Sequence, residues 1–159
     1  MIIRAYNKSE QDLADVMALL EELRGSKEAE RFSFYLQDSN TYKTSYLVSK
    51  GYYRLVALID GKIAGFIIGE HYLNDTVNLV MLYVGKEYRK KGIAFELKKV
   101  LTHLAQAWGY KKIVSQVRMN NIESIKLNLK SGWKQEIDKV HPDYYYWFTK
   151  ELIQLRNYD

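Results

Sequence analysis

The sequence of 159 residues contains no cysteine, only one proline and no long apolar run. Without cysteine the chain cannot form disulfide bonds, thiolate metal sites or a covalent intermediate on a cysteine, and it suits a reducing compartment. The longest apolar run, 77–84, is far shorter than the roughly 20 residues that cross a bilayer. The opening segment MIIRAYNKSE also lacks the apolar core of a secretory signal. We therefore expect a soluble, unprocessed cytoplasmic protein that does not act at a membrane.

What the chain does contain is typical of a folded globular protein, with 47% apolar and 27% charged residues. Its length is that of one domain, so we expect a single domain over residues 1–159. The net charge of +5 favours contact with anions. Charge alone does not distinguish a nucleic acid, a membrane surface or a small phosphorylated ligand.

The first third of the chain predicts a strand followed by two helices. Residues 2–6 alternate in polarity as in a strand, and Ser9 with Asp12 gives a capping pattern for a helix that Gly25 can end. Residues 26–50 lack sustained periodicity, and we interpret them as a loop followed by a short helix. The apolar residues that we expect on one face of the first helix are Leu13, Val16, Met17, Leu20 and Leu23.

The rest of the chain predicts a meander and then alternating helices and strands. Strands at 53–59 and 62–73 flank Asp60-Gly61, a strong hairpin signal, and a third strand occupies 76–84. A helical period begins at Gly92, and further strands and a helix follow, with a final strand at 144–152. The residues expected on one face of the helix after Gly92 are Ile93, Leu97, Val100, Leu101, Leu104 and Trp108. The order β-α-α-β-β-β-α-β-α-β-β predicts an α+β, or mixed α/β, domain.

A basic loop joins the third meander strand to that helix, as EYRKKGIAFEL over residues 87–97. The first N–H groups of a helix have no partner within it and lie at the positive end of its dipole, which favours a phosphate or pyrophosphate. Gly92 lets the backbone approach such a ligand, while Arg89, Lys90 and Lys91 add positive charge. The same pattern also fits a solvated basic face with a glycine that relieves a tight turn.

Two linked motifs decide between these interpretations, because the sequence here resembles the GNAT superfamily of acyl-CoA-dependent N-acyltransferases. Its signature, Arg/Gln-x-x-Gly-x-Gly/Ala after a central strand, corresponds to RKKGIA at 89–94. A second family pattern, Asn-x-x-Ala/Ser-x-x-Leu-Tyr-x-Lys-x-Gly-Phe, corresponds to NIESIKLNLKSGW at 121–133. The resemblance is specific over about residues 53–135 and implies a central, mostly antiparallel twisted sheet of about seven strands flanked by about four helices.

The resemblance implies acetyl-CoA, or coenzyme A, as co-substrate. In the family, backbone groups of the central strand hold the pantetheine arm, here at Leu82, Tyr83 and Val84. Asn121 and Asn128 of the second motif also count among the expected cofactor contacts, and Asn121 equally fits a helix N-cap. The loop residues expected to hold the pyrophosphate are Arg89, Lys90, Lys91, Gly92, Ile93 and Ala94.

The expected reaction is direct attack of a primary amine, on a small molecule or a protein, at the thioester carbonyl. The family's usual acid is a tyrosine, and Asn128 occupies that position here, so the standard proton donor is missing. Gln116 stands where the subgroup that acetylates protein N-termini has a glutamate base. We take Glu70 as a candidate base and Tyr83 as a candidate donor to the leaving thiolate, with a base acting through ordered water as an alternative.

Other features of the sequence bear on metal binding, oligomerisation and alternative functions. The three histidines, His71, His103 and His141, lack the spacing of metal ligands, and we predict no metal. The run of three tyrosines at 144–146 suggests packing in the core or at an edge, with substrate contact as the alternative, and an exposed final strand would permit a homodimer. An acyl-CoA-binding module without turnover is the alternative function. Nucleic-acid binding is disfavoured because the basic density is local.

Overall fold

The computed structural model describes residues 1–7, 9–26 and 52–154. Its helices are α1 (Glu10–Glu21), α4 (Ile93–Ala107) and α5 (Ile122–Lys130), with a 3-10 turn at Lys86–Tyr88. Its strands are β1 (Ile2–Ala5), β2 (Tyr52–Ile59), β3 (Lys62–Tyr72), β4 (Thr76–Val84), β5 (Lys112–Arg118), β6 (Lys134–Ile137) and β7 (Tyr145–Glu151). The short helix expected within 26–50 lies outside the described residues. The described residues therefore contain three of the roughly four expected helices.

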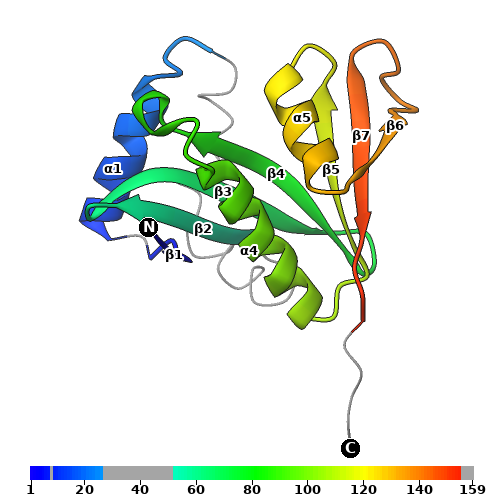
Figure 1. Ribbon diagram of the computed structural model, residues 1–159, viewed down its shortest axis with the longest axis horizontal. Helices are drawn as coiled ribbons and strands as arrows, with labels where there is room; N and C mark the ends of the chain where they lie inside the picture. The colour runs from blue at the N-terminus through cyan, green and yellow to red at the C-terminus, as the bar shows by residue number, and fades with distance from the viewer. Residues whose placement is uncertain (8, 27–51, 155–159) are drawn as a thin grey trace, which may run out of the picture.

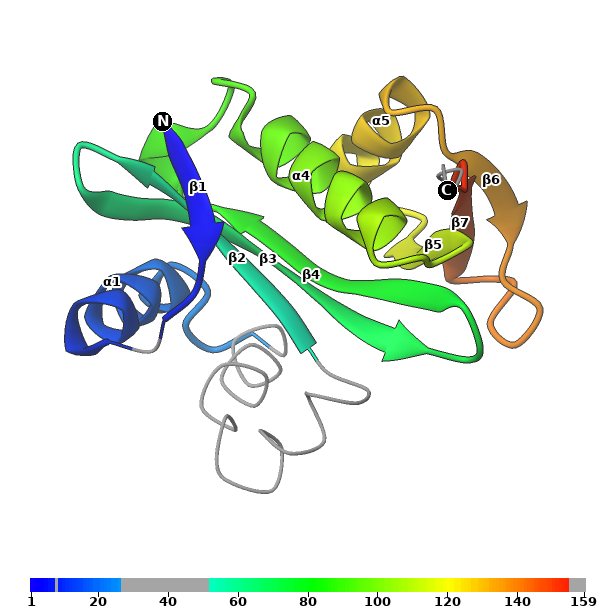
Figure 2. The same ribbon diagram turned by 90° about the horizontal axis from the view of Figure 1, so that it is seen from below.

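The strands form one seven-stranded sheet in the order β1-β2-β3-β4-β5-β7-β6. Every neighbouring pair is antiparallel except β4 and β5, which run parallel. The helix α1 covers one face of the sheet, whereas α4 and α5 cover the other (Figures 1 and 2). The expected α+β class with a mostly antiparallel sheet of about seven strands is therefore confirmed.

Local sequence signals explain several turns and caps. Asp60 and Gly61 both have positive φ, 49° and 80°, which is the conformation that a two-residue hairpin requires. At the start of α1, the hydroxyl of Ser9 accepts a hydrogen bond of 3.1 Å from the N–H of Asp12, as the capping pattern predicts. Both predictions are confirmed. Each could be made from the sequence because the residues concerned lie within a few positions of one another.

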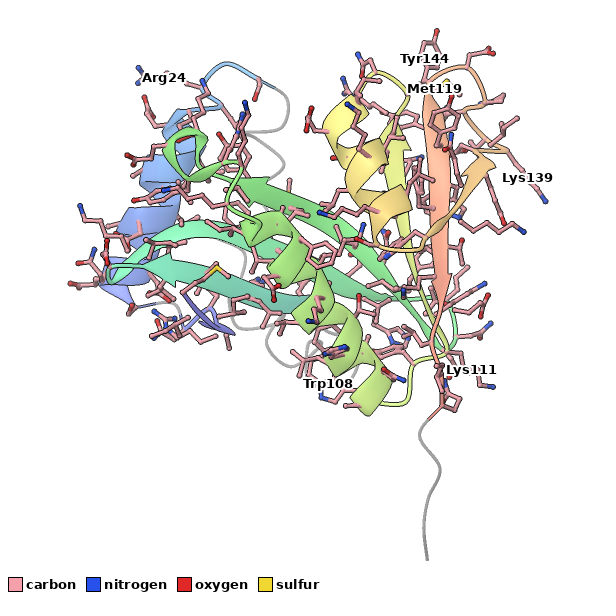
Figure 3. The ribbon with its side chains drawn as sticks, in the orientation of Figure 1. Arg24, Trp108, Lys111, Met119, Lys139 and Tyr144 are labelled. Atoms are coloured by element: carbon pink, nitrogen blue, oxygen red, sulfur yellow. The ribbon has the colours of Figure 1, made fainter. Side chains whose placement is uncertain are left out.

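The expected helix faces are correct in part. On α1, Leu13 and Met17 are each 41% exposed and Leu19 is buried instead, so the buried face is rotated from the one predicted. The pattern offers apolar residues around more than half of α1, and the packing against the sheet selects among them. On α4, Trp108 is not part of the buried face: it lies exposed at the end of the helix, where its ring stacks on Tyr53 with centroids 4.4 Å apart (Figure 3).

The final strand is not at an edge of the sheet. The strand β7 pairs with β5 on one side and β6 on the other, so the expectation that an exposed final strand could pair two subunits is wrong. The edges are β1 and β6. Tyr144, just before β7, is largely exposed (Figure 3). Tyr146 of β7 packs against the core.

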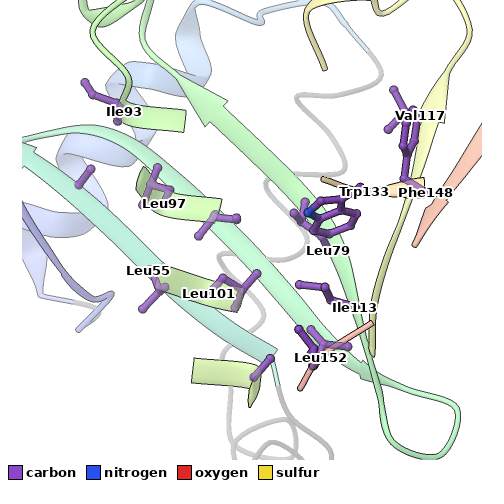
Figure 4. Packing of buried hydrophobic residues seen from close by; sticks show 14 of the residues in the cluster. Leu55, Leu79, Ile93, Leu97, Leu101, Ile113, Val117, Trp133, Phe148 and Leu152 are labelled. Atoms are coloured by element: carbon purple, nitrogen blue, oxygen red, sulfur yellow. The ribbon is translucent and has the colours of Figure 1, made fainter. Parts of the chain in front are cut away.

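Two apolar clusters fill the two faces of the sheet. The larger cluster lies under α4, where Leu97 and Leu101 pack against β-strand residues such as Leu55, and it extends to Trp133 and Phe148 (Figure 4). The smaller cluster lies under α1 around Val16. None of the helices in the described ranges is long and apolar enough to cross a membrane.

Candidate active site

The central cleft arises because β4 and β5 pair over only a short stretch. Their parallel pairing begins at Thr76 and Lys112 and ends at Asn78 and Val114, after which the strands separate. The pairing of β3 with β4 also shifts register just after this point, between Ile68 and Gly69 on β3. A cavity of about 230 Å³ occupies the space between the separated strands. It is lined by Leu79, Val80, Met81, Leu82, Lys98, Ser115, Gln116, Val117, Arg118, Asn121, Ser124, Leu127, Asn128 and Tyr145.

The loop after β4 leads directly into α4. Gly92 is the N-cap of the helix, with a left-handed φ of 80°, and no side chain among the described residues caps the first N–H groups. Lys90 is also left-handed, with φ of 63°. Arg89 donates a hydrogen bond of 3.1 Å from Nε to the carbonyl of Val84, which ties the loop to the end of β4. The loop Arg89–Ala94 therefore presents free N–H groups and the charges of two lysines at one helix end.

The helix α5 forms the opposite wall of the cavity. Asn121 is its N-cap and accepts a hydrogen bond of 3.2 Å from the N–H of Ser124, while also lining the cavity. Asn128 is 3% exposed, and its side-chain amide has no hydrogen-bond partner in the described part of the chain. The amide atoms of Asn128 open onto the cavity, where a ligand with polar groups can reach them.

A lysine of α4 completes the cavity wall. Lys98 is 2% exposed, and its Nζ lies 3.8 Å from the centroid of the Trp133 ring. Burial, followed by the nearby charge of Lys150, lowers the pKa of Lys98 to about 7. No carboxylate among the described residues pairs with this ammonium. The described lining of the cavity holds the cations Lys98 and Arg118 and no acidic side chain, which suits an anionic ligand.

Comparison with known proteins identifies this arrangement. A family model for the acetyltransferase (GNAT) family matches residues 16–133. The chain belongs to the acetyltransferase (GNAT) family. It is accordingly an acyltransferase enzyme, and the family resemblance drawn from the two motifs is confirmed.

Solved structures share the fold at low sequence identity. The PaiA N-acetyltransferase of Thermoplasma acidophilum, in complex with coenzyme A, is 20% identical, with a TM-score of 0.72 over 95% of this chain and 99% of that one. The ribosomal-protein-S18-alanine N-acetyltransferase of Escherichia coli is 15% identical, with a TM-score of 0.70 over 98% and 96%. A GNAT-family acetyltransferase of Staphylococcus aureus Mu50 is 14% identical, with a TM-score of 0.76 over 96% and 99%. No protein among the curated sequences matches the chain significantly.

Two positions that bear on proton transfer lie at the cavity: Asn128, where the family has a tyrosine, and Gln116, where one subgroup has a glutamate. Asn128 is on its wall, as described above, and Gln116 of β5 also lines it. The amide of Gln116 donates a hydrogen bond of 2.6 Å to Asp138, which also accepts from the N–H groups of Val140 and His141. These hydrogen bonds, the one from Gln116 first, lower the pKa of Asp138. The carboxylate of Asp138 therefore lies beside Gln116, and its hydrogen-bond partners favour its ionised form.

The two candidate catalytic residues lie outside this lining. Tyr83 faces α1, and its hydroxyl donates a hydrogen bond of 2.9 Å to Glu22. Burial, and then this hydrogen bond, raise the pKa of Tyr83 to about 12. Glu70 accepts a hydrogen bond of 3.2 Å from Asn78, the last residue of β4 that pairs with β5. Glu70 is therefore close to the point where the strands separate, whereas Tyr83 is engaged with α1.

Sequence reasoning missed Lys98 and Asp138. Lys98 stands four residues after Ala94 and three before Leu101, so it shares their side of α4. This spacing was the sequence signal that could have predicted the burial of Lys98. Asp138 precedes a turn far along the chain from Gln116, so nothing local connects the two. Of the histidines, His71 contacts the Tyr110 hydroxyl through Nδ1 at 3.0 Å. No group of potential metal ligands occurs among the described residues.

Proposed function

We propose that this enzyme transfers the acetyl group of acetyl-CoA to a primary amine, of a small molecule or a protein, by direct attack of the amine on the thioester. The observation that carries the proposal is the early end of the pairing between β4 and β5 at Asn78 and Val114. Beyond it, residues Leu79–Leu82 of β4 line the cavity. Their backbone groups on this edge are not paired with β5, so they remain available to a ligand. Such an open strand edge inside a fold suits the amides of a pantetheine arm.

The loop supports the same cofactor. Arg89–Ala94 would hold the pyrophosphate through the N–H groups at the start of α4, with Lys90 and Lys91 adding charge. Leu82 of β4, Asn121 at the start of α5 and Asn128 of α5 line the cavity and would contact the pantetheine arm there. The backbone of Val84, at the end of β4, would hold the arm where it leaves the strand for the loop. Acetyl-CoA carries several negative charges, and the cavity lining described above contributes two cations and no carboxylate.

The amine must lose a proton, and Glu70 is the proposed base. A lysine-like amine costs roughly 4 to 5 kcal/mol to neutralise at pH 7, whereas an α-amino group costs about 1 kcal/mol. Glu70 is half-buried and hydrogen-bonded to Asn78, beside the end of the strand pairing. We expect Glu70→Gln to lower kcat by about 100-fold for a lysine-like acceptor and by much less for an acceptor with an α-amino group. Equal losses for both amines would argue against this role.

Calorimetric titration of coenzyme A and acetyl-CoA tests the cofactor. Gly92→Glu places a carboxylate at the helix N-terminus, and Gly92→Gln is the matched control, because it imposes the same left-handed strain and size without the charge. We expect about 100-fold weaker binding for the glutamate variant and less than about tenfold for the glutamine variant. Absence of binding to the wild-type protein would overturn the proposal.

A binding module of the same fold is the second candidate, favoured by Asn128 in place of the usual acid. Acetyl-CoA binding without thiol release across a panel of primary amines would support it. Thiol release with any of these amines would exclude it, because a binding module has no turnover. We expect release even without the usual acid, since positioning alone supplies a large part of the rate of such a reaction.

A further inference from the structure

Two polar side chains in the cavity are buried and lack hydrogen-bond partners among the described residues. They are the ammonium of Lys98 on α4 and the amide of Asn128 on α5, 2% and 3% exposed. Both line the cavity between β4 and β5, so they approach its contents from two different helices. Their polar atoms open onto the cavity, so a ligand with polar groups can hydrogen-bond to both side chains there.

The position of Lys98 within the cleft follows from its contact with Trp133. The Nζ lies 3.8 Å from the centroid of that ring, and Trp133 belongs to the same packed cluster as Leu79 (Figure 4). Leu79 is the first residue of β4 after its pairing with β5 ends. Lys98 also stands more than a turn beyond Ile93, the first residue of α4, so it lies deeper in the fold than the loop at the start of the helix, between this cavity and a second one lined by Trp133 and Lys150.

A coenzyme A molecule held with its pyrophosphate at the loop and its pantetheine arm along β4 would have its sulfur in this deeper part of the cleft. From this geometry, and resting on the proposed function, we infer that Lys98 is the proton donor to the departing thiolate of coenzyme A. Lys98 thereby takes the role of the family's tyrosine, whose position in the sequence is occupied here by Asn128. The amide of Asn128 contributes a hydrogen bond but no transferable proton.

The proton balance of the step is complete. The amine lone pair forms the C–N bond with the thioester carbonyl carbon, and the C–S bond breaks with its electron pair on sulfur. One proton passes from the Lys98 ammonium to sulfur, which leaves as a thiol. One proton is lost by the new amide nitrogen to a base or to water, and neutral Lys98 recovers a proton from solvent.

The surroundings of Lys98 suit this exchange. The charged and titratable groups that line the two cavities with it are Lys99 and His103 on its own helix, Tyr145, Lys150 and Glu151 on β7, and Arg118 on β5. Cations outnumber the single carboxylate, and Lys150 donates its own hydrogen bond to the carbonyl of Ser131. Burial and Lys150 hold the pKa of Lys98 at about 7, so the ammonium loses a proton near neutral pH far more readily than an exposed lysine.

The test needs no acceptor amine. The ultraviolet absorbance of the thiolate reports the thiol pKa of coenzyme A bound to the protein, with desulfo-coenzyme A as the blank. Lys98→Met removes the ammonium while keeping an apolar chain, and Lys99→Met is the matched control, since Lys99 is the exposed neighbour on the same helix. Circular dichroism and a thermal melt establish that each variant folds.

We expect the wild-type protein and Lys99→Met to increase the thiolate fraction of bound coenzyme A at least about tenfold over free coenzyme A below the thiol pKa. Lys98→Met should bind coenzyme A and lose this increase. The same thiol pKa in Lys98→Met and wild type would overturn the role of Lys98, even if the affinity falls. No binding of coenzyme A to the wild type would instead overturn the proposed cofactor, and the inference with it.

An amine identified by the panel provides a second readout. Lys98→Met should then lower kcat by about 100-fold or more, with a smaller change in KM, and remove the limb of the pH profile near 7. A lower affinity for acetyl-CoA with unchanged kcat would show that Lys98 only binds the cofactor and would contradict the inference.

Discussion

Around α1, the buried carboxylate of Asp12 accepts two hydrogen bonds from Arg4, at 2.7 and 2.8 Å, and a third from the N–H of Asn7. On the opposite face of the sheet, the ammonium of Lys98 and the amide of Asn128 are as deeply buried, yet neither has a hydrogen-bond partner among the described residues. The difference separates two uses of buried polar groups. Asp12 is satisfied within the fold and fixes its geometry, whereas Lys98 and Asn128 present their polar atoms to the cavity, where a ligand can reach them.

The largest predicted effect is on the pH dependence of stability. Unfolded Lys98 keeps its proton up to about pH 10.4, whereas burial lowers its pKa in the fold to about 7. Between these values the unfolded state binds more protons, so the stability of the wild type should rise with pH relative to that of Lys98→Met, by an amount on the order of 4 kcal/mol. Urea unfolding of both proteins between pH 7 and 10 measures it, with Lys99→Met as the control. Parallel curves would mean that Lys98 is not costly to bury.

The second prediction concerns the satisfied carboxylate. Asp12→Ala should lower the free energy of unfolding by about 1 to 3 kcal/mol and leave coenzyme A binding unchanged, because it removes the hydrogen bonds to Arg4 and to the backbone far from the cleft. Glu10→Ala is the matched control, since Glu10 lies exposed in the same first turn. Thermal and urea unfolding measure the loss, and a weakened affinity for coenzyme A would break the separation of the two regions.

The same variant has a defined pH dependence. The hydrogen bonds from Arg4 lower the pKa of Asp12 below its ordinary value, so its electrostatic contribution is present above the unfolded pKa of about 3.9. That contribution is lost as the pH falls through the lowered pKa in the fold. The difference in stability between wild type and Asp12→Ala should therefore shrink in acid, and a difference that grows there would contradict the assignment.

The third prediction lies at the boundary between cleft and helix cap. Asn121 caps α5 and also lines the cavity, so Asn121→Ala should cost about 1 kcal/mol of stability and also weaken coenzyme A binding by a few fold. Asn121→Asp is the informative comparison, because aspartate keeps the cap but brings a negative charge to the cavity. If both variants bind coenzyme A as the wild type does, Asn121 acts only as a cap.

The features that could be predicted from the sequence are those set by neighbours in the chain. The hairpin at Asp60-Gly61, the Ser9 cap and the loop that enters α4 at Gly92 all depend on residues within a few positions of one another. The buried face of α1 was predicted only in part, because the choice between Met17 and Leu19 depends on how the helix rests on the sheet.

The cleft itself required the fold. A lysine within a helix is usually solvated, and only the arrival of α5 and Trp133 over α4 buries Lys98. The position of β7 between β5 and β6 likewise could not be read from its own residues, since strand order depends on pairings across the whole sheet. Of the residues that the motifs predict at the cofactor, Leu82, Asn121 and Asn128 line the cavity, whereas Tyr83 faces α1. The residues proposed for proton transfer could be chosen only from the three-dimensional arrangement.

Tyr83 gives the smallest predicted effect and tests the sequence-based choice of donor directly. Its hydroxyl donates to Glu22, which also accepts a hydrogen bond of 2.8 Å from the N–H of Lys86, so Tyr83→Phe leaves that carboxylate with a partner. We expect a loss of about 1 kcal/mol in stability and a change in kcat of less than about threefold. Tyr72→Phe, on the partly exposed end of β3, serves as control. A large fall in kcat for Tyr83→Phe alone would instead show that the proton for the thiolate comes from the α1 face, and the contrast between the two faces would no longer hold.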